Sequence, residues 1–382
     1  MQSNGFKTWV EIDSKAYSHN IESLRSLLLP GVIFCSVIKA NAYGHDLEIM
    51  VKLGIDNNIN CFAVDSVDEA QRVRKISKDC ELYILGYIPP EKYADAILSD
   101  AIITVYDEQT ISELAKISQK LQYKCLVNIK CETGTNRQGV LEKDFKHLLA
   151  SIEKTRGNIN LHSLSSHFSC SEDTNKQLIT ELQNNKFDIF INECKKFGFS
   201  PNCFHISCSA SALLYKNTQR SMVRFGIAQY GYWPSNEVRD AFTKKHPTFR
   251  LKPILTWKTK VAQIKDIQSG VSVGYNQKFI SDRPMRIAIL PIGYYDGLVR
   301  SYSNNGYVII RSHKCQIIGN ICMNMCMVNI SSVPQVNIGD DVIIIGHDNI
   351  HSITAENHAT STNTIHYEVV TRISEHISRI IV

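Results

Sequence analysis

Short apolar runs alternate with segments of helical periodicity from about Val32 onward. Eight runs fit this description: GVIFCSVIK, NCFAVD, LYILG, AIITVY, CLVNIK, LHSLSSHF, CFHIS and SMVRFG. Strands that are apolar on both faces and separated by helices are typical of parallel β-structure. Eight repeats within roughly 240 residues match a closed (β/α)8 barrel, and an open doubly wound sheet is the competing fold. We favour the barrel, because no GxGxxG fingerprint follows the first run.

One helix is expected before the first of these strands. Asp13 and Ser14 form a helix-start signal, and apolar residues then recur at helical spacing as far as Leu28, just before Pro30. We therefore expect an extra helix ahead of the barrel.

The pattern changes after about Pro253. The runs ILTWKTKVAQI, RIAILPI, GYVIIR, CQIIGNICMNMCMVNI and DDVIIIG are strand-like and separated by Gly, Asn and Asp turns. A helical stretch from about Thr364 to Ile377 closes the chain. We predict a barrel domain over residues 1–245 and a mainly-β domain over residues 246–382, and leave open an exchange of the first helix and last strand between them.

Composition narrows the function to small-molecule chemistry in a soluble protein. The chain has 382 residues, 43% hydrophobic and 21% charged, which excludes a disordered or fibrous protein. The charge excess, 42 − 37 = +5, is spread along the chain, so we expect no nucleic-acid and no membrane partner. The twelve cysteines occur singly without CxxC spacing, which predicts buried free thiols and no metal site. With no signal-peptide pattern and no membrane-spanning run, we expect a cytoplasmic location.

Nitrogen-bearing side chains follow five of the eight predicted strands. They are Lys39, Lys130, His167, His205 and Arg224. Because barrel enzymes place their chemistry at the carboxyl ends of the strands, these side chains are expected to meet at one mouth.

Lys39 suggests covalent chemistry with a carbonyl compound. It follows Val37 and Ile38, and partial burial there favours the neutral, nucleophilic amine over a lysine that simply extends into solvent. Ser209 at a helix start and the amides of Gly226 and Ile227 offer an anion site, although each of these is commonly structural when it occurs alone. Together they suit an aldehyde cofactor that carries a phosphate.

Ten ordered segments resemble the alanine racemase family. They are WVEIDSKAYSHN, VIKANAYGHD, KCETGTNRQG, SSHF, HISCSA, VRFGIAQYGYWPS, VSVGYNQKF, PIGYYDG, IGNICMNM and TIHYE. The resemblance implies an N-terminal barrel that binds pyridoxal 5'-phosphate, a C-terminal β domain, and racemisation of alanine that supplies D-alanine for cell-wall peptidoglycan. It also implies a homodimer with shared active sites.

The resemblance assigns roles to individual residues. It implies that Lys39 binds the cofactor covalently and is the base on one face of the substrate carbon, and that Tyr275 of the partner copy is the base on the other face. The implied phosphate ligands are Tyr43, Ser209, Gly226, Ile227 and Tyr367. The implied substrate-carboxylate ligands are Arg137, Met323 and Tyr294, and Lys130 resembles a lysine that is often carbamylated and holds the arginine.

Two bases on opposite faces are what racemisation requires, since one proton is removed and another returned from the other side. A tyrosine phenolate needs nearby positive charge, and we expect His167 and His205 beside Arg224 to supply that field; the alternative is that both are ordinary core histidines. If Arg224 faces the pyridine nitrogen, as the resemblance implies, that nitrogen stays unprotonated, which favours racemisation over decarboxylation.

Several positions depart from the family pattern. Cys208 stands where HxxNSA has asparagine, Asn324 where CMDQ has aspartate, Asn276 where glycine is usual, and residues 132–135 read ETGT where DTGM is common. Two alternatives stay open: a racemase of serine or other small amino acids on the same scaffold, and a non-catalytic carrier of pyridoxal phosphate. A carrier typically consists of the barrel alone, whereas this chain retains the β domain.

Overall fold

A computed structural model describes residues 5–382 of the chain. The chain divides into two compact units. The barrel unit contains residues 15–42 and 47–253, and the β unit contains the residues up to Ser14, residues 43–46 and residues 254–382. The boundary that we predict between residues 245 and 246 precedes this division and stays a prediction. Residues 1–4 lie outside the described part, and the expectation of no signal peptide falls partly on them.

All eight apolar runs form strands of one parallel sheet. The strands are β2 (Ile33–Val37), β3 (Cys61–Val64), β4 (Glu81–Ile84), β5 (Ile102–Val105), β6 (Cys125–Lys130), β7 (Ile159–Ser165), β8 (Cys203–His205) and β9 (Met222–Phe225). Their spatial order is β8-β7-β6-β5-β4-β3-β2-β9. Backbone hydrogen bonds from Ser221 to Phe204 (3.0 Å) and from Arg224 to Ser207 (3.1 Å) bring the two end strands together. The sheet is thus a nearly closed barrel, as predicted.

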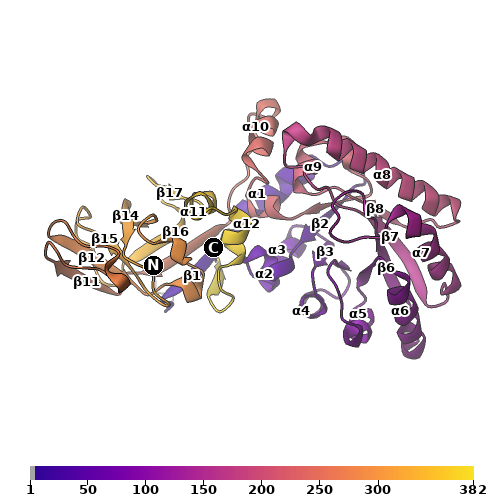
Figure 1. Ribbon diagram of the computed structural model, residues 1–382, viewed down its shortest axis with the longest axis horizontal. Coiled ribbons are helices and arrows are strands. Elements are labelled where there is room, and N and C mark those ends of the chain that lie inside the picture. Colours follow the sequence, from indigo (N-terminus) through magenta and orange to yellow (C-terminus); the bar gives the residue numbers. More distant parts are fainter. Residues whose placement is uncertain (1–4) are drawn as a thin grey trace. The chain divides into compact units, whose positions relative to one another are not determined.

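Helices surround these strands (Figure 1). They are α1 (Ser14–Arg25), α3 (Leu47–Asp56), α4 (Val67–Ile76), α5 (Tyr93–Leu98), α6 (Glu108–Leu121), α7 (Glu142–Lys154), α8 (Gln177–Lys196), α9 (Ser209–Leu214) and α10 (Asn236–Lys245). Helix α4 shows why they form: the Ser66 hydroxyl accepts a hydrogen bond from the Glu69 amide, and Val67, Ala70 and Val73 are buried. No helix among residues 5–382 combines the length and the apolar composition needed to span a membrane.

The β unit is a ten-stranded sheet. Its strands are β1 (Thr8–Ile12), β10 (Leu255–Lys260), β11 (Gln263–Ile267), β12 (Met285–Leu290), β13 (Tyr307–Ile310), β14 (His313–Ile318), β15 (Cys326–Asn329), β16 (Asp341–His347), β17 (Ser352–Ile353) and β18 (Ser378–Ile381). Strand β10 alternates buried and half-buried side chains, which is the pattern of a sheet with one face on the core. Part of that core is formed by Met285, Ile287, Ile318 and Met327.

The chain ends agree with the prediction only in part. The expected helix ahead of the barrel is α1, but an unpredicted strand, β1, precedes it and pairs antiparallel with β10 and parallel with β18. The final helix, predicted over about Thr364 to Ile377, is the shorter α12 (His366–Thr371); an unpredicted helix, α11 (Ala355–Thr362), precedes it, and strand β18 follows it. Asn363 between the two helices has a φ of 55°, and this left-handed residue ends α11.

Candidate active site

The predicted nitrogen side chains of the barrel unit lie at the carboxyl ends of its strands. Lys130 and His205 are the last residues of β6 and β8, and Arg224 is one residue from the end of β9. Lys39 and His167 each follow a strand, β2 and β7, by two residues. Since the strands are parallel, the structure places all five on the same side of the barrel.

Arg224 is the centre of a buried hydrogen-bond network. Its Nη1 lies 2.5 Å from Nδ1 of His205, and its Nη2 lies 3.2 Å from Nδ1 of His167. Nη2 also donates to the carbonyl oxygens of Ser166 (2.8 Å) and Ile206 (3.2 Å). Because a guanidinium only donates, both Nδ1 atoms are acceptors, and each ring carries its proton on Nε2. The Arg224 Nε takes no part in these contacts and is left as a donor.

Both histidines are therefore neutral. Burial lowers the pKa of His205 well below its usual value, and the neighbouring Arg224 and Lys130 lower it further. Burial also lowers the pKa of His167 well below its usual value, with contributions from Lys130 and Arg224. The expectation that these rings supply a positive field is wrong, because the low pKa values keep both uncharged near neutral pH. The guanidinium alone supplies positive charge in this network.

Lys130 is a buried amine among cations. Burial, first, and then the charges of Arg224 and Arg137 lower the pKa of its ammonium well below the usual value. Arg137 is exposed in the loop 131–140, whose ends pair with each other: the Val140 amide donates to the Lys130 carbonyl over 2.8 Å. The two guanidinium groups, Arg224 and Arg137, bring the positive charge, which favours an anionic ligand.

Lys39 begins a left-handed turn. Ala40, Asn41, Ala42 and Tyr43 all have φ between 50° and 55°, a region that costs a residue with a side chain roughly 1–2 kcal/mol. Such strain is typical of functional sites, where the surrounding structure holds it. The Lys39 amine forms an ion pair with Asp65, Nζ to Oδ1 3.3 Å, and its side chain is 41% exposed.

An anion cradle lies beside Arg224. Ser209 is the first residue of α9, and its hydroxyl accepts a hydrogen bond of 3.1 Å from the Gly226 amide. Ile227 begins the short helix η4 (Ile227–Tyr230), where a backbone amide has no acceptor within the helix. A phosphate suits these donors. Because β2 and β9 are neighbouring strands, with Cys35 opposite Arg224, the Lys39 amine projects from the strand adjacent to the cradle. This donor set fits pyridoxal phosphate.

The other predicted site residues belong to the β unit. The rings of Tyr43 and Tyr367 lie 6.3 Å apart. Tyr294 is joined to the segment of Met323, because its amide donates to the Cys322 carbonyl over 3.0 Å. The same segment reaches Tyr275, whose carbonyl accepts a 3.0 Å hydrogen bond from Asn320.

The departures from the family pattern have visible local roles. Asn276 has a φ of 58°, so it occupies a left-handed position that asparagine tolerates better than other residues with a side chain. Cys208 precedes α9, and its Sγ lies 3.5 Å from the Ser171 hydroxyl. Buried Glu132 accepts a 2.5 Å hydrogen bond from the Gly134 amide and shapes the loop 131–140. Asn324 is exposed in the β unit.

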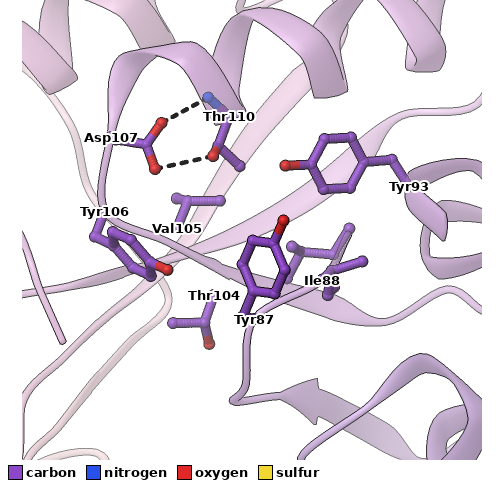
Figure 2. Close-up of a pocket in the computed structure, with 9 residues that line it drawn as sticks. Tyr87, Ile88, Tyr93, Thr104, Val105, Tyr106, Asp107 and Thr110 are labelled. Atoms are coloured by element: carbon purple, nitrogen blue, oxygen red, sulfur yellow. Dashed lines mark hydrogen bonds between the residues drawn. The ribbon is translucent and has the colours of Figure 1, made fainter. Parts of the chain in front are cut away.

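A separate hollow lies near the ends of β4 and β5. It encloses about 260 Å³, part of it open to solvent, and Figure 2 shows the rings of Tyr87 and Tyr93 facing it. None of the predicted site residues lines it. It is distinct from the cradle beside Arg224.

Asp65 lies at this mouth although it was not predicted there from the sequence. Lys39 and Asp65 each lie two residues beyond Val37 and Ala63, which are partners in the ladder of β2 and β3. The one available signal was its place at the end of an apolar run, NCFAVD.

Comparisons with known proteins agree with this geometry. A family model described as the alanine racemase N-terminal domain matches residues 12–234, and one described as the alanine racemase C-terminal domain matches residues 254–381. The chain is 36% identical to the alanine racemase of Leptospira interrogans over 379 residues, 99% of this chain and 96% of the relative. It is 35% identical to alanine racemase 1 of Clostridium acetobutylicum over 378 residues, 97% of this chain and 94% of the relative.

Solved structures give the same result. Alanine racemase of Clostridium difficile 630 matches with a TM-score of 0.92 at 29% identity, covering 100% of this chain and 97% of that one. The Bacillus anthracis alanine racemase with bound L-Ala-P has a TM-score of 0.92 at 30% identity, with 98% and 95% covered. The Bartonella henselae enzyme with covalently bound pyridoxal phosphate has a TM-score of 0.84 at 26% identity, with 99% and 100% covered.

Proposed function

The chain belongs to the alanine racemase family of amino-acid isomerases, and we propose that it interconverts L- and D-alanine with pyridoxal 5'-phosphate bound at the barrel mouth. The observation that carries this proposal is the buried Arg224, held between two neutral histidines beside an anion cradle, with the Lys39 amine on the neighbouring strand.

Each part of the cofactor has its own proposed ligands. Ser209, Gly226 and Ile227 would hold the phosphate, and the hydroxyls of Tyr43 and Tyr367 would donate hydrogen bonds to it. Lys39 would bind the aldehyde carbon. When bound, the cofactor withdraws electrons from the α-carbon of an attached amino acid and so makes its proton acidic.

Arg224 is the residue that favours racemisation over decarboxylation. Its Nε, as a donor on a permanent cation, would hold the cofactor's ring nitrogen as an acceptor and so keep a proton off it. His167 and His205 accept hydrogen bonds from the guanidinium and fix its plane. The weaker electron withdrawal limits side reactions and favours racemisation over decarboxylation.

Two bases move the proton. Lys39 takes the α-hydrogen from D-alanine or returns it there, and Tyr275 of a second copy does the same for L-alanine on the opposite face of the α-carbon. Tyr275 is 69% exposed, and Met323, Tyr294 and Tyr295 are also exposed in the β unit. Exposed apolar side chains of this kind support a protein partner there, so we propose a homodimer whose copies complete each other's sites.

The loop 131–140 carries the proposed substrate ligand Arg137. Arg137 binds the carboxylate, assisted by Met323 and Tyr294 of the second copy. The neutral Lys130 amine is suited to react with carbon dioxide: a nitrogen–carbon bond forms, one proton leaves, and the resulting carbamate holds Arg137 by charge. The twelve free cysteines support a reducing cytoplasmic compartment, and we propose that D-alanine for peptidoglycan is the product used by the cell.

Hydrogen exchange in D2O tests the two-base assignment. The equilibrium constant between enantiomers is one, so kcat/KM is equal in both directions for any variant, and direction appears only in the exchange of the α-hydrogen. In Tyr275→Phe, recovered D-alanine should still gain deuterium through Lys39, while L-alanine keeps its hydrogen. Tyr295→Phe, an exposed neighbour, is the matched control. Loss of exchange from both enantiomers alike in Tyr275→Phe contradicts the assignment.

The alternatives give different results. A serine racemase turns over L-serine with a higher kcat/KM than L-alanine. A carrier binds the cofactor and leaves enantiopure alanine unchanged, so a coupled assay with D-amino-acid oxidase on L-alanine separates it from an enzyme.

A further inference from the structure

Asp65 is placed opposite Lys39 by the barrel itself. In the parallel ladder of β2 and β3, Val37 is the partner of Ala63, and Lys39 and Asp65 each lie two residues beyond this last pair. The Lys39 Nζ lies 3.3 Å from Asp65 Oδ1. The two residues therefore meet where two neighbouring strands end.

The backbone of Asp65 is fixed on both sides. Its amide donates to Glu69 Oε2 over 2.8 Å, and its carbonyl accepts a hydrogen bond of 3.1 Å from Gly86. A Cβ on Gly86 would lie 2.4 Å from the Asp65 carbonyl oxygen and 2.7 Å from Oδ2. The absence of a side chain at position 86 therefore leaves room for the carboxylate.

Among the described residues, the Asp65 carboxylate forms no other hydrogen bond or ion pair that stabilises the local structure. Ser66, not Asp65, caps helix α4. Glu69 uses its two oxygens on the amides of Asp65 and Asn41, the latter in the left-handed turn after Lys39. Within residues 5–382, Lys39 is the one cation that forms an ion pair with Asp65.

We propose that Asp65 is a positioning residue for the base Lys39: it holds the released amine at the mouth and stabilises the ammonium formed there. This inference rests on the proposed function. When Lys39 acts, the bond between the α-carbon and its hydrogen breaks, the electron pair stays with the substrate carbon, and the proton joins Nζ. The Asp65 carboxylate then faces the new positive charge until the proton leaves again.

The first test uses the protein without cofactor. Lysine acylation at pH 8, followed by peptide mass spectrometry, measures how readily each amine reacts. Loss of an exposed ion pair changes the availability of its amine roughly 1.4- to 5-fold, so Asp65→Asn should label Lys39 about threefold faster. Asp65→Glu should keep the slow rate, and Asp68→Asn, an exposed acid on α4, is the matched control. If Asp65→Asn does not fold, Asp65→Ser removes the same charge.

The second test uses the loaded enzyme in D2O. Asp65→Asn should slow deuterium uptake into recovered D-alanine about threefold and leave uptake into L-alanine unchanged, whereas a merely structural defect slows both. Unchanged Lys39 labelling together with symmetric exchange overturns the proposal. Failure of the wild type to form a covalent bond between cofactor and Lys39 overturns the proposed function instead, and the labelling test remains valid without it.

Discussion

Acid should weaken the β unit through a single buried histidine, His358 on α11. Its ring is 3% exposed, stacks on Tyr302 with centroids 4.1 Å apart, and has Nε2 3.0 Å from the Ile344 carbonyl. Burial lowers the pKa of His358 to about 4. The substitution His358→Gln keeps a donor for the Ile344 carbonyl and removes the titrating ring.

The sign and size of the effect follow from proton linkage. The unfolded chain binds a proton to histidine below a pKa of about 6.5, whereas folded His358 stays neutral down to about 4. Stability is therefore complete above pH 6.5 and falls as the pH drops below it, by about 1.4 kcal/mol per pH unit. At pH 5 the loss from this one ring is about 2 kcal/mol.

Urea unfolding followed by tryptophan fluorescence measures this loss. The chain has three tryptophans, and in a Trp233→Phe background the remaining two, Trp9 and Trp257, both report on the β unit. Between pH 7.5 and pH 5, the His358→Gln variant should lose about 2 kcal/mol less than its parent. His347→Gln, at an exposed ring on β16, is the control. Equal losses in the parent and in His358→Gln would show that His358 is not the group whose protonation weakens the β unit.

Two further predictions concern the barrel site. Ser209→Ala removes a hydroxyl from the cradle and leaves the Gly226 amide without its acceptor. Because a charge-assisted hydrogen bond is lost, the Kd for pyridoxal phosphate, measured by absorbance titration, should rise about 10- to 100-fold. An unchanged Kd would contradict the assignment of the cradle. Arg224→Lys leaves the buried Ser166 and Ile206 carbonyls without a donor. Urea unfolding of the cofactor-free protein should therefore show a free energy of unfolding lower by about 3 kcal/mol. A decrease below about 1 kcal/mol would mean that the network does not stabilise the fold.

The barrel could be predicted from local sequence patterns. Each of its strands is a short apolar run buried on both faces, and helices with their own caps separate them, so the signal lies within a few residues. Strand β1 was missed because its identity depends on partners at β10 and β18, far along the chain. Helix α11 was missed because it buries only Ala355, His358 and Ala359 and so has no large apolar side chains at helical spacing.

The site was only partly accessible from the sequence. Residue types at strand ends indicated Lys39, Lys130 and Arg224, but the charge states of His167 and His205 depend on burial beside a guanidinium. The left-handed turn after Lys39 has no sequence signature, since its alanines favour right-handed helix. The proximity of Asp65 to Lys39 could be seen only once the pairing of β2 with β3 was known.

Covalent capture of pyridoxal 5'-phosphate shows whether Lys39 is the residue that binds the cofactor. The purified protein is incubated with pyridoxal 5'-phosphate, reduced with borohydride, digested and analysed by peptide mass spectrometry. We expect a stable pyridoxyl adduct on Lys39 and its loss, together with the absorbance band, in Lys39→Ala. An adduct confined to another lysine such as Lys130, or none at all, would contradict this assignment.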